Sequence, residues 1–107
     1  MDGRAEALAG WCEVHSVLTH FSVAKGNERR FEEEFATLQA EIISGEAGTV
    51  GFQLYRSSDT ARDYLLIAHF RDEAAQEAHE SGIIRKRAKA LYALCEGSPK
   101  IGGWRAL

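Results

Sequence analysis

A run of nearly continuous apolar residues, DYLLIAHFR at positions 63–71, places the strongest constraint on how this chain can fold. A run of this length and composition predicts a β-strand that is covered on both of its faces. A second segment, TVGFQLYR at residues 49–56, alternates apolar side chains with others and predicts a partner strand. Residues 57–62 between them predict the turn of a β-hairpin. The fold must therefore cover both sides of this hairpin.

Helical and extended patterns flank the hairpin on each side. Residues 13–23 alternate with period two and predict a strand, and residues 28–43 carry an apolar stripe at helical spacing, with Asn27 as the expected N-cap. After the hairpin, Asp72 is expected to cap a short helix that ends at Gly82. The remaining expected elements are a helical segment over residues 83–95 and a strand over residues 100–105.

The order of these elements, β-α-β-β-α-β, defines the fold class. It predicts an α+β, ferredoxin-like fold, in which one antiparallel sheet carries its helices on one face. The chain of 107 residues is long enough for a single domain with one core. We assign residues 13–107 to that domain and residues 1–12 to an N-terminal extension.

Composition and charge exclude several classes of partner. The net charge is −3, so the chain lacks the basic field that attracts nucleic acid. No apolar run approaches the roughly 18 residues that cross a bilayer, and the N-terminus lacks a signal-peptide pattern, which predicts a cytoplasmic protein with no membrane partner. Cys12 and Cys95 are expected to be reduced thiols, and a bridge between them is the alternative.

The second face of the predicted sheet is apolar although no helix is left to cover it. The side chains expected on this face are Leu18, His20, Leu65, Ile67 and His69. A monomer would expose them as a large apolar patch. A symmetric homodimer that packs sheet against sheet would bury them.

The segment from residue 46 to residue 81, EAGTVGFQLYRSSDTARDYLLIAHFRDEAAQEAHES, resembles the antibiotic biosynthesis monooxygenase family. With the first strand and helix, the resemblance covers about residues 14–105. It implies a dimeric α+β barrel with a pocket between the sheet and the helices of each subunit. Members include cofactor-free oxygenases of aromatic phenols and quinols, as well as haem-degrading enzymes. The residues that match the family pattern are Glu46, Gly48, Phe52, Leu54, Tyr55, Arg56, Ser57, Asp59, Tyr64, Leu66, Asp72, Ala75, His79 and Ser81.

The chain departs from the family pattern at positions that bear on its chemistry. Phe70 stands where a Trp commonly ends the third strand, and Ala68 stands where an acidic residue precedes it. Haem-degrading relatives use an Asn on the first strand, a Trp on the third and a His in the last helix. Thr19 and Phe70 occupy the first two places and the last helical segment contains no His, which argues against haem degradation.

Alternation along the strands predicts a pocket with aromatic walls. Such walls stack on flat ligands and exclude water, and a hydroxyl among them can stabilise a phenolate. Plain core packing is the alternative interpretation. The residues proposed to bind an aromatic substrate are Thr19, Phe21, Phe35, Tyr64, Phe70 and Tyr92, and the candidates for a catalytic role are Thr19, His79 and Tyr92.

The remaining polar candidates allow two interpretations each. His79 is either a structural cap or gate at the end of the short helix, or a general base. His20 and His69 form either a hydrogen-bonded pair at the dimer face or a pair that titrates or binds a metal, and no third ligand at suitable spacing joins them. We therefore expect no metal site at these histidines. Arg56 makes either a surface or interface ion pair or a contact to an anionic substrate.

Three functions follow from the sequence, in decreasing order of support. The first is a cofactor-independent monooxygenase that oxidises a small aromatic or quinol-type metabolite with O2. The second is a non-catalytic dimeric α/β-barrel protein that binds a small molecule or serves in stress response. The third is a haem-degrading relative.

Overall fold

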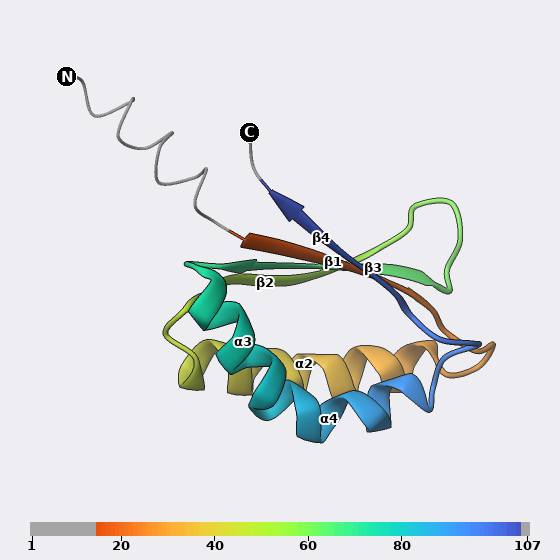
Figure 1. Cartoon of the computed structure of the whole chain (residues 1–107). Coiled ribbons are helices and arrows are strands. Elements are labelled where there is room, and N and C mark those ends of the chain that lie inside the picture. The colour runs from red at the N-terminus through yellow and green to blue at the C-terminus, as the bar shows by residue number, and fades with distance from the viewer. Residues whose placement is uncertain (1–14, 106–107) are drawn as a thin grey trace.

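The computed structural model describes residues 15–105 and is drawn in Figure 1. Within this range the elements follow the predicted order β-α-β-β-α-β, and the second helical region is divided into two helices at Gly82. The proposed extension over residues 1–12, and Cys12 with it, lies outside the described residues. The bounds are β1 (His15–Ser22), α2 (Glu28–Gly45), β2 (Thr49–Arg56), β3 (Asp63–Phe70), α3 (Glu73–Ser81), α4 (Ile83–Tyr92) and β4 (Lys100–Arg105).

The four strands form one antiparallel sheet in the order β2-β3-β1-β4. Within residues 15–105, the helices α2, α3 and α4 all lie on the same face of this sheet (Figure 1). The arrangement confirms the predicted α+β, ferredoxin-like fold. Among residues 15–105 no helix combines the length and apolar character needed to cross a membrane.

The start of α3 confirms one predicted cap, and the start of α2 corrects another. The Asp72 carboxylate accepts a hydrogen bond from the backbone N–H of Ala75 at 2.8 Å, which satisfies a donor at the free end of α3. Asn27 precedes α2, but its side chain makes no capping bond. Its amide Nδ2 instead donates to the carbonyl oxygen of Leu94, 3.3 Å away. The tertiary contact replaces the local one.

The helical segment predicted over residues 83–95 is too long at its C-terminal end. The helix α4 stops at Tyr92, and Cys95 forms an isolated antiparallel bridge with Val23. The backbone N–H of Glu96 also donates to the Ser22 carbonyl at 2.7 Å. These contacts pull the chain out of the helix toward the end of β1. Cys95 still packs against the core as expected, and its thiol is free.

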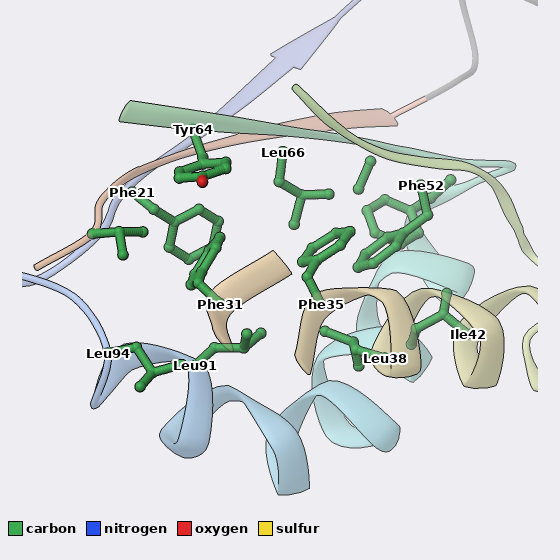
Figure 2. Packing of buried hydrophobic residues seen from close by; sticks show 13 residues of the cluster. Phe21, Phe31, Phe35, Leu38, Ile42, Phe52, Tyr64, Leu66, Leu91 and Leu94 are labelled. Atoms are coloured by element: carbon green, nitrogen blue, oxygen red, sulfur yellow. The ribbon is translucent and has the colours of Figure 1, made fainter. Parts of the chain in front are cut away.

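The core lies between the sheet and α2 and is rich in aromatic rings (Figure 2). Near the start of α2, the Phe31 ring lies 5.2 Å from that of Phe21 and 4.9 Å from that of Tyr64, measured between centroids. Further along, Phe35 stacks on Phe52 of β2 at 5.4 Å. These contacts fix α2 beneath β2 and β3.

The face of the sheet opposite the helices carries the residues predicted to meet a second subunit. The strand register places Leu18 opposite Ile67 and His20 opposite Leu65, on the face that the helices leave open. These residues are only half-buried in the single chain. On the same face, Trp104 of β4 is 63% exposed.

Candidate active site

A cavity of about 300 Å³ lies between the sheet and the helices, and we call it the inner cavity. Its walls come from β1, β3, β4 and all three helices, and most of its lining is apolar. This volume is at the lower end of the range for small-molecule sites. The lining residues are Val17, Thr19, Phe21, Phe35, Leu38, Leu66, Ala68, Phe70, His79, Glu80, Ile84, Arg85, Ala88, Leu91, Tyr92 and Ile101.

The cavity exists because the helix α4 lies away from the strands and some of the positions beside the gap carry small residues. The helix packs mainly against α2 and α3 (Figure 1). The residues that face the gap from β3 and α4 include Ala68 and Ala88. In β4, Gly103 stands opposite Val17 and has open space where a side chain would lie. Since none of these positions carries a large side chain, the gap is not filled.

Five of the six residues predicted to bind an aromatic ligand line this cavity: Thr19, Phe21, Phe35, Phe70 and Tyr92. Tyr64 is the exception: it does not line the inner cavity, so this cavity gives its predicted role in substrate binding no support. It points to the helix-covered face as expected, but at the end of the sheet where Phe31 occupies the space beneath it.

The hydroxyl of Tyr64 is also committed to another contact. It donates a hydrogen bond to Glu32 Oε2 at 2.7 Å. Burial, this hydrogen bond and the negative charge of Glu32 raise the pKa of Tyr64 to about 12. Tyr64 therefore ties β3 to α2 as a neutral donor.

Thr19 and Tyr92 provide hydroxyl groups in the cavity wall. Thr19 is buried on β1, while Tyr92 at the end of α4 is 37% exposed and sits at 6.2 Å from the Phe21 ring. Burial raises the pKa of Tyr92, so its hydroxyl keeps its proton. No hydrogen bond among residues 15–105 occupies either hydroxyl. Both are therefore available to a ligand.

The third polar group in the wall is the imidazole of His79, which is 8% exposed. The ring lies between Phe70 and Phe52, with centroids 4.8 Å and 5.6 Å away. Its Nδ1 is 2.7 Å from Oε1 of Glu46, which follows α2. The same carboxylate oxygen accepts a hydrogen bond from the Thr49 hydroxyl at 2.8 Å. A buried histidine–carboxylate pair thus closes one end of the cavity.

A second hollow of about 540 Å³ lies on the other side of this pair. It is lined by the segments that flank β2 and α3, including Glu46, Arg71 and Asp72. His79 is the residue that borders both the inner cavity and the second hollow. The Oε2 atom of Glu46 is buried and accepts no hydrogen bond from the part of the chain that the structure describes.

The two other histidine candidates do not form a pair within one chain. Both lie on the open face of the sheet, but His69 stands opposite Ser16 and His20 opposite Leu65. They are separated by four residues, or about 13 Å along the strands. Ser16 Oγ lies 2.7 Å from His69 Nδ1, and His20 Nε2 lies 3.4 Å from an Asp63 oxygen. No group of three metal-ligating side chains is found among residues 15–105.

Arg56 makes a surface ion pair and lies outside the cavity. Its Nη1 is 3.5 Å from Glu32 Oε2, and both side chains are largely exposed. Arg85 of α4 differs from Arg56: although it is exposed, it borders the inner cavity beside Glu80.

Sequence reasoning missed Glu46 as a member of the site. It lies outside every helical stripe and strand alternation, since it follows α2 in a short connection. The signal that could have found it is the family pattern, which includes both Glu46 and His79. A shared pattern does not show that two residues 33 positions apart touch, and the fold supplies that information.

Comparison with known proteins agrees with the resemblance. The sequence profile of the antibiotic biosynthesis monooxygenase family matches residues 14–90. A search of the curated proteins gives no match. A solved structure of a conserved protein from Methanosarcina mazei is 15% identical, with a TM-score of 0.84 over 91% of this chain and 96% of that one.

Two further solved structures carry names related to this family. A Caulobacter crescentus protein that bears the family name is 20% identical, with a TM-score of 0.83 over 96% of this chain and 98% of that chain. SnoaB from Streptomyces nogalater, a cofactor-independent oxygenase, is 27% identical, with a TM-score of 0.75 over 88% of this chain and 93% of SnoaB. The shared fold spans nearly the whole of each chain.

Proposed function

The chain belongs to the antibiotic biosynthesis monooxygenase family, and we propose that it is a cofactor-independent monooxygenase that oxidises a small aromatic, quinol-type molecule with O2. The observation that carries this proposal is the inner cavity. It is apolar, walled by Phe21, Phe35 and Phe70, and holds two hydroxyls that no hydrogen bond within residues 15–105 engages. The similarity to SnoaB supports the same class of reaction.

The cavity suits a flat aromatic ligand better than a polar or charged one. Aromatic rings stack on such ligands and exclude water from them. The hydroxyls of Thr19 and Tyr92 can donate hydrogen bonds to a phenolate oxygen, which stabilises negative charge in an otherwise apolar space. A charged ligand would have to give up its hydration for few polar contacts.

In the proposed reaction the substrate itself supplies the electrons. A phenolic proton leaves, and its electron pair stays on the substrate. The anion passes one electron to O2, and the resulting radical and superoxide combine to form the C–O bond of a peroxide. For an anthrone, the reacting species is the anthrol tautomer, in which one hydrogen of the CH2 carbon has moved to the ketone oxygen and is the phenolic proton that leaves. Once the peroxide has formed on that carbon, the carbon loses its remaining hydrogen, the O–O bond breaks, the carbon becomes C=O and the other oxygen atom leaves as water. The protein contributes desolvation and stabilisation of the anion.

The test is turnover of reduced aromatic substrates under isotopically labelled O2. Naphthohydroquinone and the dihydroxyanthrone dithranol serve as substrates, and mass spectrometry follows the products. With dithranol we expect one labelled oxygen atom in the product ketone, at a rate well above autoxidation. Dithranol binding without oxygen uptake above autoxidation would contradict the proposal and favour a non-catalytic binding protein.

Replacement of one hydroxyl tests how the anion is stabilised. Thr19→Val keeps the shape of the side chain and removes the donor, so we expect an unchanged fold and turnover reduced by about 10- to 100-fold. Unchanged turnover would remove Thr19 from the mechanism.

We also propose that the functional unit is a homodimer formed by the open faces of two sheets. That face carries Leu18, Leu65 and Ile67 together with the exposed Trp104, an apolar area that a monomer would leave in water. Sedimentation at micromolar concentration should show a dimer. Leu18→Asp should dissociate it, whereas Ile43→Asp, which changes an exposed apolar residue of α2, should not. A wild-type monomer would contradict this proposal.

A further inference from the structure

We propose that His79 is the base that removes the phenolic proton of a substrate in the inner cavity, and that Glu46 holds its imidazole in the tautomer able to do so. The inference rests on the proposed function and assigns a residue to its first step. It starts from two observations: the 2.7 Å contact between His79 Nδ1 and Glu46 Oε1, and the position of His79 between two hollows.

The contact with Glu46 fixes which nitrogen of His79 can act as a base. An ionised carboxylate only accepts hydrogen bonds, so Nδ1 must carry the hydrogen that it donates to Glu46. In the neutral ring, Nε2 is then unprotonated and has a free lone pair. No described residue hydrogen-bonds to Nε2.

The position of the ring assigns a direction to that lone pair. Glu46 borders the second hollow and not the inner cavity, whereas His79 borders both. The two nitrogens of an imidazole point in nearly opposite directions. With Nδ1 turned toward Glu46, Nε2 is the nitrogen directed to the side where a substrate would bind.

The carboxylate of Glu46 is held in place by donors from two elements. Thr49 donates to Oε1, the oxygen that also contacts His79, while Oε2 is buried and accepts no hydrogen bond from residues 15–105. The charged or titratable side chains that border the two hollows next to His79 are Glu46, Glu80, Arg71, Asp72, Arg85 and Tyr92. Glu46 is the one among them that contacts the imidazole ring.

The proton balance of the step is simple. The phenolic O–H bond breaks, its proton moves to Nε2 of His79, and the electron pair remains on the substrate oxygen. The imidazolium that forms is stabilised by the negative Glu46. After O2 has added, the same Nε2–H can return its proton to the peroxide oxygen, which leaves His79 ready for another turnover.

A purely structural histidine would also be buried and bonded to Glu46, so the test must measure proton transfer itself. Dithranol is mixed with the protein under argon, where no oxygenation occurs, and the absorbance band of its anion is recorded. The wild-type protein should ionise the bound dithranol near neutral pH. His79→Gln should bind it in the un-ionised form.

Turnover under air provides the second readout. We expect His79→Gln to lower kcat by about 100-fold or more, within the range for loss of a general base. Glu46→Gln should lower kcat less and move the acid limb of the pH–rate profile to lower pH, because the imidazolium loses its negative partner. Glu77→Gln, which removes a carboxylate from α3 outside both hollows, serves as the control and should leave turnover unchanged.

Chemical rescue separates a base from a structural cap. Imidazole added to His79→Ala should restore a part of the turnover, and other imidazoles should do so in the order of their basicity. Loss of turnover through misfolding would not respond to added bases in this way. Circular dichroism of each variant checks the fold.

The outcomes distinguish this inference from the proposed function. Equal ionisation of dithranol by wild type and His79→Gln would overturn the role of His79, whether or not oxygen is consumed. Failure of the wild type to ionise bound dithranol would overturn it as well. Ionisation by the wild type under argon without oxygen uptake under air would uphold the base and reject the monooxygenase.

Discussion

Two regions of the space between the sheet and the helices use the same kinds of residue, yet one is filled and the other is hollow. In the packed region, Phe31 of α2 reaches Phe21 and Tyr64 of the sheet. In the hollow region, which is the inner cavity, rings such as Phe70 and small residues such as Ala88 of α4 line an open space. Aromatic content alone therefore does not distinguish a core from a pocket. The difference lies in how large the side chains of the opposite element are and how close it comes.

The largest difference between the two regions should appear in stability. Phe31→Ala removes a fully buried ring from the packed region and should cost about 3–5 kcal/mol of unfolding free energy. Ile84→Ala, at the wall of the cavity, should cost no more than half as much, because its side chain already faces empty space on one side. Urea denaturation measures both values, and equal losses would break the comparison.

Filling the inner cavity should instead affect activity. Ala88→Phe places a ring in the inner cavity and should lower kcat/KM by about 10- to 100-fold, which corresponds to the roughly 1–3 kcal/mol of overpacking that a ligand would meet there. The matched control is Ala90→Phe, on the exposed side of the same helix. Similar kinetics for the two variants would place the substrate outside the cavity.

The two tyrosines sharpen the same contrast, since Tyr64 belongs to the packed region and Tyr92 lines the cavity. Tyr64→Phe removes the hydrogen bond to Glu32 and should cost about 1 kcal/mol of stability while turnover stays unchanged. Tyr92→Phe should leave stability within about 0.5 kcal/mol and slow turnover several-fold, since no hydrogen bond from residues 15–105 engages its hydroxyl and the proposed ligand would. Thermal unfolding and steady-state kinetics test the pair, and a reversal of the two effects would contradict these roles.

The smallest expected effect is on the stability of the protein at alkaline pH. The pKa of Tyr64 is about 12 in the folded protein, above the ordinary value near 10. The folded state thus keeps a proton that the unfolded state loses, and the stability that Tyr64 contributes declines as the pH rises from about 10 toward 12. Tyr64→Phe should show a weaker decline of unfolding free energy over this interval. An identical pH dependence in both proteins would argue against the buried hydrogen bond.

Most of the fold follows from patterns that act over a few residues. Strand alternation, the helical stripe of α2 and the Asp72 cap depend on neighbours in sequence, and each is found in the structure. The errors occur where distant contacts prevail. Asn27 bonds to Leu94 rather than to its own helix, and Cys95 leaves the helical path to pair with Val23.

The predicted placement of the candidate-site residues succeeds where local patterns decide and fails where distant contacts decide. Thr19, Phe21 and Phe70 are placed correctly because a strand alternates its side chains regardless of context. Tyr64 obeys the same alternation but lies where α2 fills the space, which depends on the position of Phe31. The contact between His79 and Glu46 depends on the helix α3 meeting the connection after α2, and it has no periodic signature.

The most direct test of the central claim is a crystal structure of the protein with dithranol, grown under argon. We predict that the ring system lies in the inner cavity between the sheet and α4, with a phenolic oxygen about 3 Å from Nε2 of His79. Dithranol bound in the second hollow, on the open face of the sheet, or in the cavity with its oxygens turned away from His79 would contradict the account.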